Sequence, residues 1–365
     1  MAGAAGGNGG KGTGVCKRCG KEGKVMQCSK CDSAHYCGTE CQRADWKEHK
    51  KECSRLAEEF MAYKLGSAVG LNIKGSYEKS LKQMQKLEQV QRQRTGGAGG
   101  EALTAASLVE VGRALSLQGR YEEALEKLSE GLKLSRKLYG NEHEDTADCI
   151  VMLGVATHEL GRYDAALALY NEALGIQWKL HGHNHKQFAN TLGSIALVHR
   201  RQGRYEEAIE VFGEALRIYK ERLGAEHELV ATTLHNMALI RAHQGKVLEA
   251  LKGFKKSLRI CKKARGSDHP SVAQTLNCMS TMYLRLGKHQ KADEALDEAL
   301  RISERQLGHE HPQVAVVLGN MSTLYSSQGK YSKALEASKE ALRIREKMLG
   351  NLHLYVGFTC TMIRM

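Results

Sequence analysis

The sequence lacks the apolar segments of a membrane or secreted protein. No run of about 18 apolar residues, the length that crosses a bilayer, occurs in the chain. Residues 1–14 are rich in glycine and contain no apolar stretch of the kind found in a signal peptide. These absences predict a protein of a reducing compartment with no membrane partner. The cytoplasm is the expected location, with the nucleus left open.

Proline is also scarce, and both prolines carry information. Pro270 and Pro312 lie 42 residues apart, and each follows a histidine. Proline is favoured at the first position of a helix, where its missing N–H group is not needed. Both prolines therefore predict helix starts. The preceding His269 and His311 are predicted to be cap or loop residues rather than metal ligands.

Cysteine, by contrast, is concentrated near the N-terminus, where seven cysteines and one histidine within residues 16–53 form a set of eight candidate metal ligands. Thiolate and imidazole are ligands that zinc selects, and four of them close a tetrahedral site without an open position for catalysis. The eight ligands predict two structural Zn²⁺ ions in a binding module. A disulfide framework is disfavoured, because nothing directs the chain to an oxidising compartment. The ligands are Cys16, Cys19, Cys28, Cys31, Cys37, Cys41, His49 and Cys53.

The spacing of these ligands supports zinc but leaves their pairing open. The first four form two Cys-x-x-Cys knuckles. Cys37 and Cys41 lie four residues apart, as do His49 and Cys53, which places each pair on one face of a helical turn. By spacing alone, the four knuckle cysteines could share one ion.

The run Tyr36-Cys37-Gly38-Thr39-Glu40-Cys41-Gln42, with Trp46, His49-Lys50 and Cys53 after it, resembles a MYND-type zinc finger. The resemblance covers about a tenth of the chain and implies interleaved zinc sites. One site would hold Cys16, Cys19, Cys37 and Cys41, and the other would hold Cys28, Cys31, His49 and Cys53. The family commonly docks short proline-containing peptides, which would here contact Gln42 and Trp46. Packing of Trp46 on the zinc knuckles is the alternative.

The rest of the chain is an internal repeat with a period of 42 residues. A first glycine series is followed by Arg or Lys and, five residues on, by alanine. A second glycine series is followed three residues later by histidine. The first series is Gly119, Gly161, Gly203, Gly245, Gly287 and Gly329, and the second is Gly140, Gly182, Gly224, Gly266, Gly308 and Gly350. Six periods without an insertion predict a repeat protein.

Each period is typical of a helical hairpin. In the fourth, Leu234, Met237 and Ile240 form an apolar stripe at helical spacing, and Gly245 is expected to end that helix. A second apolar stripe follows, and Gly266 is expected to end the second helix. Glycine suits both positions because it adopts a left-handed conformation readily. One hairpin cannot bury its apolar faces alone, so the hairpins are expected to stack into a solenoid.

The pattern resembles tetratricopeptide (TPR) repeats, and the Leu-Gly-x-x-His-Pro linker between hairpins resembles the longer repeats of kinesin light chains. The resemblance extends over about residues 103–353 and implies a peptide-binding concave groove. No long heptad segment that could pair with a motor heavy chain precedes the repeats. The predicted fold is therefore an all-α TPR solenoid of six repeats plus a partial seventh, with a small two-zinc finger.

Two residue columns on the first helix of each hairpin are predicted to line the groove, because they lie seven residues apart and share a face. Counting back nine residues from the first glycine series gives Glu110, Met152, Ser194, Asn236, Cys278 and Asn320. Counting back two gives Leu117, Glu159, Arg201, His243, Arg285 and Ser327. The resemblance implies that Asn236 and Asn320 hold the peptide backbone, since an amide both donates and accepts. Arg201, His243 and Arg285 would favour an acidic peptide, and an ordinary solvated polar face is the alternative.

The formal net charge of +13 raises the question of nucleic acid. Residues 101–365 contain 36 Lys/Arg against 31 Asp/Glu, so the excess lies in the finger and linker. No recognition helix is apparent, which argues against nucleic acid as a partner. The protein is predicted to be a non-catalytic adaptor for protein or peptide partners. The alternative is a zinc-finger chromatin- or RNA-associated regulator that uses the basic N-terminal region.

The expected organisation has five parts. They are a disordered Gly-rich tail (1–14), the finger (15–54), a helical linker ending in a Gly-rich joint (55–100), the solenoid (101–353) and the start of a truncated seventh repeat (354–365). The last part is apolar and has no polar cap beyond it, whereas solenoids need a polar terminal face. It therefore either pairs with another copy of the chain or continues in a longer protein, and the second explanation is favoured.

Overall fold

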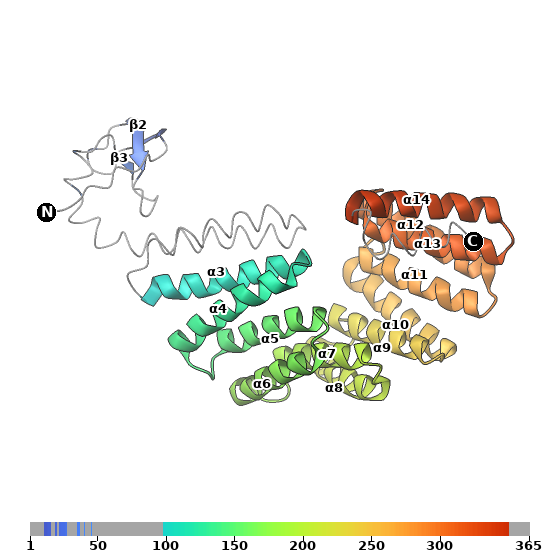
Figure 1. Cartoon of the computed structure of the whole chain (residues 1–365), viewed down its shortest axis with the longest axis horizontal. Coiled ribbons are helices and arrows are strands. Elements are labelled where there is room, and N and C mark those ends of the chain that lie inside the picture. Colours follow the sequence, from blue (N-terminus) through green and yellow to red (C-terminus); the bar gives the residue numbers. More distant parts are fainter. Residues whose placement is uncertain are drawn as a thin grey trace. The chain divides into compact units, whose positions relative to one another are not determined.

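The computed structural model describes residues 11–15, 22–27, 35–36 and 98–349, together with the single positions 19, 40 and 45. The chain forms two compact units, Met1–Leu180 and His181–Met365 (Figure 1). The first contains a small sheet and four helices, and the second contains eight helices, counted over the described residues.

Three short strands form an antiparallel sheet near the N-terminus. They are β1 (Lys11–Val15), β2 (Glu22–Gln27) and β3 (His35–Tyr36), in the order β1-β2-β3. Val15 pairs with Glu22, and Met26 pairs with both Lys11 and Tyr36. This sheet was not predicted, and β1 begins within the stretch expected to be a disordered Gly-rich tail. A strand of this composition owes its order to hydrogen bonds with β2 rather than to its own side chains.

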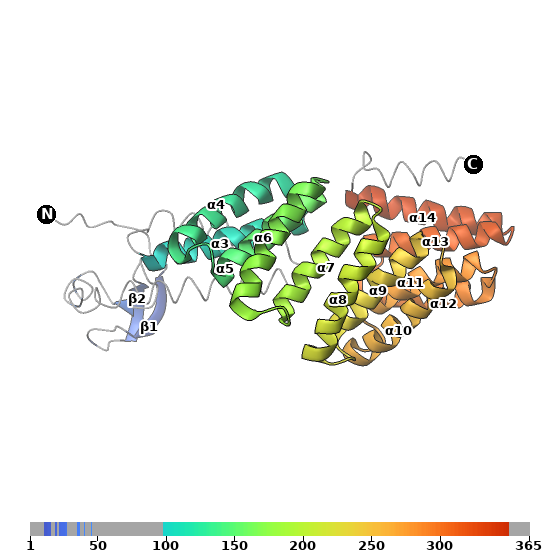
Figure 2. The ribbon, with the colours of Figure 1, turned by 90° about the horizontal axis from the view of Figure 1, so that it is seen from below.

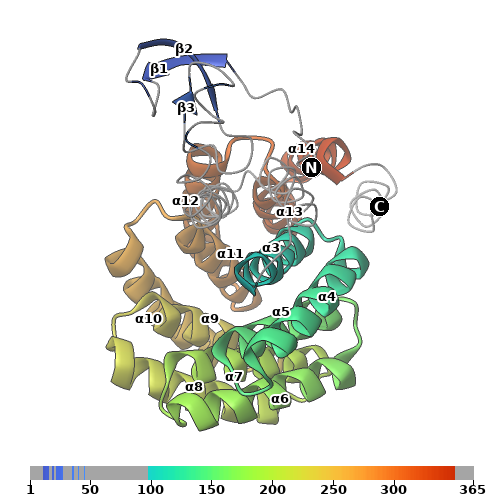
Figure 3. The ribbon, with the colours of Figure 1, turned by 90° about the vertical axis from the view of Figure 1, so that its left-hand side faces the viewer.

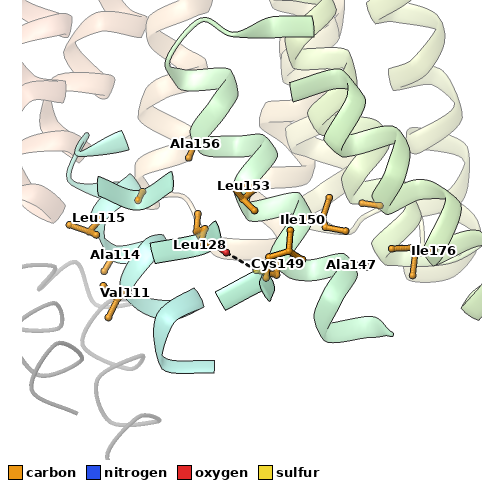
Figure 4. Packing of buried hydrophobic residues seen from close by; sticks show 13 residues of the cluster. Val111, Ala114, Leu115, Leu128, Ala147, Cys149, Ile150, Leu153, Ala156 and Ile176 are labelled. Carbon is orange, nitrogen blue, oxygen red and sulfur yellow. Dashed lines mark hydrogen bonds between the residues drawn. The ribbon is translucent and has the colours of Figure 1, made fainter. Parts of the chain in front are cut away.

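Four helices of the first unit form two hairpins. They are α3 (Ala98–Leu117) with α4 (Tyr121–Tyr139), and α5 (Glu144–Glu159) with α6 (Tyr163–His181). Helix α3 begins within the glycine-rich segment that was expected to be a joint. Figure 4 shows the core of this unit, where Leu128 of α4 packs against Ile150 and Leu153 of α5. The buried Cys149 thiol donates to the carbonyl oxygen of Leu128 at 3.4 Å.

Eight helices of the second unit form four hairpins that stack in chain order (Figures 2 and 3). Contacts within each hairpin and between successive hairpins hold the stack together. The helices are α7 (Lys186–Arg201), α8 (Tyr205–Leu223), α9 (Glu228–His243), α10 (Val247–Arg265), α11 (Pro270–Arg285), α12 (His289–Leu307), α13 (Pro312–Ser327) and α14 (Tyr331–Leu349).

The predicted helical-hairpin fold is thus confirmed, with six hairpins in residues 98–349. The partial seventh repeat (354–365), and with it the predicted uncapped end, lies outside the described residues. None of the described helices is both long enough and apolar enough to cross a membrane.

Glycine ends the helices as predicted. In the fourth hairpin, Gly245 follows α9 with φ of 76°, and Gly266 follows α10 with φ of 89°. Residues with a Cβ rarely adopt this left-handed region, so glycine is required at both stops.

Histidine begins the first helix of successive hairpins. In each case the ring Nδ1 accepts a hydrogen bond from the backbone N–H two residues later, at 3.1–3.4 Å. Such a side-chain acceptor satisfies a backbone donor that has no partner within the helix. The predicted cap role of His269 and His311 is therefore confirmed, and Pro270 and Pro312 are the first residues of α11 and α13. The capping residues are His143, His185, His227, His269 and His311.

Small residues line the contact between the two helices of a hairpin. The alanine that follows the first glycine series is buried in all six hairpins, which lets two helix backbones approach closely. These residues are Ala124, Ala166, Ala208, Ala250, Ala292 and Ala334. In the first unit, Gly112 and Gly154 lie against the side chains of Leu128 and Tyr170 in the same way.

Ion pairs follow the repeat in the second unit. In three of its four hairpins, those of α9, α11 and α13, an acidic residue in the loop before the first helix pairs with two basic residues on the second helix. Each such surface pair contributes little by itself, but the repetition ties the loop to its hairpin three times. The sets are Glu226 with Arg259 and Lys263, Asp268 with Arg301 and Arg305, and Glu310 with Arg343 and Lys347.

Candidate functional site

Seven of the eight predicted zinc ligands lie outside the described residues, as do Gln42 and Trp46. Cys19 is the exception and is exposed in a turn between β1 and β2. Three of the other predicted ligands directly follow the strands in the sequence. Cys16 follows the last residue of β1, Cys28 follows β2, and Cys37 follows β3.

The predicted groove columns lie on the accessible side of the first helices in the second unit. Arg201, His243 and Arg285 are exposed, and each is the last residue of its helix. The positive charges of Arg201 and Arg285 are favoured there by the negative end of the helix dipole. The three side chains therefore occupy equivalent places at the ends of α7, α9 and α11.

Two of these residues also contact neighbouring repeats. Arg285 Nη1 donates to the carbonyl oxygen of Ala242, near the end of α9, at 3.1 Å. The ring of His243 stacks on Tyr205 at the start of α8, with centroids 6.1 Å apart and planes within 7°. Burial lowers the pKa of His243, and the charges of Arg200 and Arg285 lower it further.

Arg200 is a further cation, which belongs to neither of the two predicted groove columns. It lies one position before Arg201 in α7, is partly buried, and its Nε has no hydrogen-bond partner among the described residues. Burial lowers the pKa of Arg200, followed by the charge of Arg201. Among the described helices, Arg200, Arg201 and Arg285 form no ion pair. The only sequence signal for Arg200 was its place beside a groove column.

The two predicted backbone-binding asparagines have different surroundings. Asn236 is half-buried in the middle of α9. Asn320 of α13 donates from Nδ2 to Oδ1 of Asn277 on α11, at 2.8 Å. The amide oxygen of Asn320 makes none of the hydrogen bonds found within the described residues.

A neutral histidine lies beside Asn236. His235 is only 8% exposed, and its ring packs against that of Phe254 with centroids 5.2 Å apart and planes inclined at 63°. Its Nδ1 lies 3.2 Å from the hydroxyl of Thr275, which itself donates to the carbonyl oxygen of Ser271. The Thr275 hydrogen is thereby used, so His235 Nδ1 is the donor of that pair. Burial, then the charge of Arg200, lowers the pKa of His235 to about 4.

The cysteines of the solenoid are not arranged for reaction. Cys149 and Cys261 are buried and Cys278 is half-buried. Burial raises the pKa of Cys149 to about 12 and that of Cys278 to about 11. Neither thiol forms the reactive thiolate at neutral pH. No group of three metal-binding side chains occurs within the described residues.

Known families match both parts of the chain. The family model of the tetratricopeptide repeat matches residues 103–177, 187–241, 229–296 and 271–347. The family model of the MYND finger matches residues 16–53, which span all eight predicted ligands.

A curated relative matches the finger alone. Histone-lysine N-methyltransferase SMYD3 of Mus musculus is 52% identical over 44 residues, 12% of this chain and 10% of the relative. This chain thus spans about a tenth of the length of that relative, and the similarity does not reach beyond the finger.

Two solved structures are similar to this chain in fold. BtubC (BKLC) from P. vanneervenii has a TM-score of 0.54 at 24% identity, over 63% of this chain and 92% of its own. NprR in complex with its cognate peptide NprX has a TM-score of 0.57 at 18% identity, over 88% of this chain and 93% of its own. At these identities the similarity concerns the fold. With the repeat model covering more than half of its length, the chain belongs to the tetratricopeptide repeat family and carries an N-terminal MYND finger.

Proposed function

We propose that the protein is a non-catalytic adaptor that holds two polypeptide ligands. The groove of the second unit binds an extended acidic peptide, and the MYND finger docks a short proline-containing peptide. Both modules belong to families that generally mediate protein interactions. The observation that carries the proposal is the alignment of Arg201, His243 and Arg285 at the ends of three successive first helices.

The electrostatics of this row support an acidic ligand. Arg200 and Arg201 form no ion pair with the described residues, and the Arg285 hydrogen bond goes to a neutral carbonyl. The charges of Arg200 and Arg285 are close enough to act on His243 between them. A carboxylate entering this region would gain charge-assisted hydrogen bonds without breaking an existing ion pair.

Two zinc ions with interleaved ligands are part of the proposal. The match of the MYND finger model to residues 16–53 supports this pairing. Interleaved sites hold together segments that are far apart in a stretch of chain too short to bury a sizeable core.

The absence of catalysis is supported by the extent of the similarities. The similarity to the methyltransferase is confined to the finger, and the remainder matches the repeat family. Soft thiolate ligands that fill a tetrahedral site leave zinc no position for substrate or water.

The groove is tested with a labelled acidic peptide that is rich in glycine, so that it does not form a stable helix and lacks the proline that the finger is proposed to dock. Its affinity for the full-length, zinc-loaded chain is measured by fluorescence anisotropy. Arg201→Glu should weaken binding about tenfold, because it removes one attraction and adds one repulsion. The matched control is Lys220→Glu, the same charge change on exposed α8. Equal affinity of wild type and Arg201→Glu would place the peptide elsewhere.

The finger is tested separately. Native mass spectrometry should find two zinc ions per chain, and Trp46→Ala should abolish binding of a proline-containing peptide while both ions remain. Loss of zinc in that variant would give Trp46 a structural role instead. Salt-dependent binding of random duplex DNA that is indifferent to both variants would favour the chromatin or RNA alternative.

A further inference from the structure

Helix α10 differs in charge from the other second helices of the solenoid. It contains seven Lys and Arg residues but only one acid, Glu249. Its neighbours along the stack carry mixed charge, with Glu210 and Glu214 on α8 and Glu294 and Glu298 on α12. The charge of α10 is therefore a local property and not a feature of the repeat.

The internal repeats show which positions have changed. At the position of Lys256, the five other hairpins all have glutamate: Glu130, Glu172, Glu214, Glu298 and Glu340. At the position of Lys252, the others have Glu126, Ala168, Glu210, Glu294 and Glu336. At the position of Leu248, they have Glu122, Asp164, Glu206, Gln290 and Ser332. Three positions on one helix thus carry lysine or leucine where most sibling hairpins carry an acidic or an uncharged polar residue.

These side chains lie in a row on the solvent face of α10. Leu248 is 68% exposed, although it is a large apolar residue. Lys252, Lys256, Arg259 and Lys263 follow it at helical spacing, and all four are exposed. The cations span about 16 Å at a rise of about 1.5 Å per residue. We call Leu248, Lys252, Lys256, Arg259 and Lys263 the basic row.

The basic row is incompletely neutralised. Arg259 and Lys263 share Glu226, whereas no ion pair of the described residues involves Lys252 or Lys256. In the next two hairpins the equivalent arginine also pairs with a glutamate three residues before it: Arg301 with Glu298, and Arg343 with Glu340. In α10 that glutamate is replaced by Lys256, which repels Arg259 instead of pairing with it.

The row is also narrow. The second helices of the adjacent hairpins bear Glu210, Glu214, Glu294 and Glu298 at the equivalent positions. A helix with its side chains is about 10 Å across, close to the Debye length at physiological salt. A duplex nucleic acid or a membrane surface would extend over these carboxylates and be repelled. A single polypeptide segment lying along α10 would not.

We propose that the basic row of α10 docks an acidic amphipathic helix with an apolar residue at one end. Glutamates spaced as i, i+4, i+7 and i+11 on the ligand repeat with the same rise as the four cations, so the two rows stay in register. In an extended strand, carboxylates on the same face lie about 6.6 Å apart, so four of them span about 20 Å. This exceeds the span of about 16 Å of the four cations, and the two rows would be out of register. The apolar residue packs on Leu248. This surface is separate from the groove of the first helices and takes a different conformation of ligand.

The test compares two alanine-rich synthetic peptides of about 18 residues, long enough to form helix in water. One has four glutamates on one face and a leucine one turn beyond each end of the glutamate row. The other has the same composition with the glutamates dispersed around the helix. Binding of each labelled peptide to the full-length, zinc-loaded chain is measured by anisotropy at low and physiological salt.

The variants use residues that the sibling hairpins already carry. The double variant Lys252→Glu with Lys256→Glu introduces the glutamates found at the equivalent positions of α8, α12 and α14. Leu248→Glu introduces the residue found at the equivalent position of α8, Glu206. These changes should therefore leave the thermal melting of the chain intact. The matched control is Lys291→Glu with Lys339→Glu, the same charge change at exposed positions of α12 and α14.

The one-face peptide should bind about tenfold more tightly than the dispersed peptide. The double variant on α10 should weaken it tenfold or more, Leu248→Glu should weaken it about threefold, and the control should change it less than twofold. Equal binding of the two peptides, or an equal loss in the control, would overturn the proposal. So would a loss caused by Arg201→Glu, which would assign the peptide to the groove. Tighter binding of duplex DNA or of a second copy of the chain through the same lysines would overturn the choice of ligand.

Discussion

The guanidinium of Arg285 donates a hydrogen bond to the carbonyl oxygen of Ala242, 43 residues away in the preceding hairpin. The carbonyl belongs to the last turn of α9 and also accepts from the backbone N–H of Gly245, just beyond the helix, at 3.1 Å, so Arg285 is its second donor. Arg285 thus fastens α11 to the end of α9 as well as lining the predicted groove. Its substitution will change both stability and ligand binding, whereas Arg201 makes no such bond.

Arg285→Ala should lower the free energy of unfolding by about 1 kcal/mol, because the bond to Ala242 is lost. Arg201→Ala, at the equivalent end of α7, should change it by less than about 0.5 kcal/mol. Urea unfolding followed by circular dichroism measures both. Equal effects of the two substitutions would show that the inter-hairpin hydrogen bond contributes nothing.

The histidine caps lead to a second prediction. His227 Nδ1 accepts from the N–H of Leu229 at 3.1 Å and begins α9. His227→Ala should cost about 1 kcal/mol of stability, whereas His227→Asn should cost much less because asparagine can accept the same bond. Thermal melting of the three proteins under one condition provides the comparison. An alanine variant as stable as the asparagine variant would show that the ring packs rather than caps.

Acid should destabilise the second unit. Burial, as the largest cause, lowers the pKa of His199, His235, His243, His269 and His311 below the ordinary value near 6.5. A lowered histidine pKa means that the unfolded chain binds more protons than the folded chain as pH falls below 6.5. The stability from these groups is therefore complete above pH 6.5 and decreases as pH falls toward the folded pKa values.

His235 should account for the largest part of this effect. Its pKa of about 4 lies well below 6.5, a difference worth on the order of 3 kcal/mol over that interval. Urea unfolding at a series of pH values, for wild type and for His235→Asn, measures it. Asparagine is the residue at the equivalent position of α11, Asn277. In the variant, the free energy of unfolding should depend less steeply on pH between about 6.5 and 4. Parallel curves for the two proteins would assign the acid sensitivity to other groups.

The features that sequence analysis predicted correctly are local ones. Gly245 and Gly266 end helices, and His269 caps one, through interactions within a few residues of chain, and the 42-residue period repeats each signal six times. The features it missed depend on pairing between distant segments. The sheet requires β1 to find β2, and the Arg285 bond requires α9 and α11 to pack at a particular offset. The proximity of Arg200 to His235 and His243 likewise follows from packing between hairpins.

Two glycines of the first unit provide a matched pair for the last prediction. A Cβ at Gly154 in α5 would lie 2.6 Å from Cε1 of Tyr170, whose ring is fully buried and has no room to move. Gly154→Ala should therefore destabilise the unit by about 1–3 kcal/mol through overpacking. Gly175 in α6 has nothing within 4 Å of its Cβ position.

Gly175→Ala should accordingly raise the free energy of unfolding by about 0.5–1 kcal/mol, because alanine favours helix over glycine. The two substitutions are chemically identical and both lie in helices of the second hairpin. Opposite shifts in the urea midpoint would therefore isolate the Tyr170 contact. If Gly154→Ala were instead stabilising, the ring of Tyr170 would have to move aside at no cost, and α5 and α6 would be less tightly packed than their buried contact indicates.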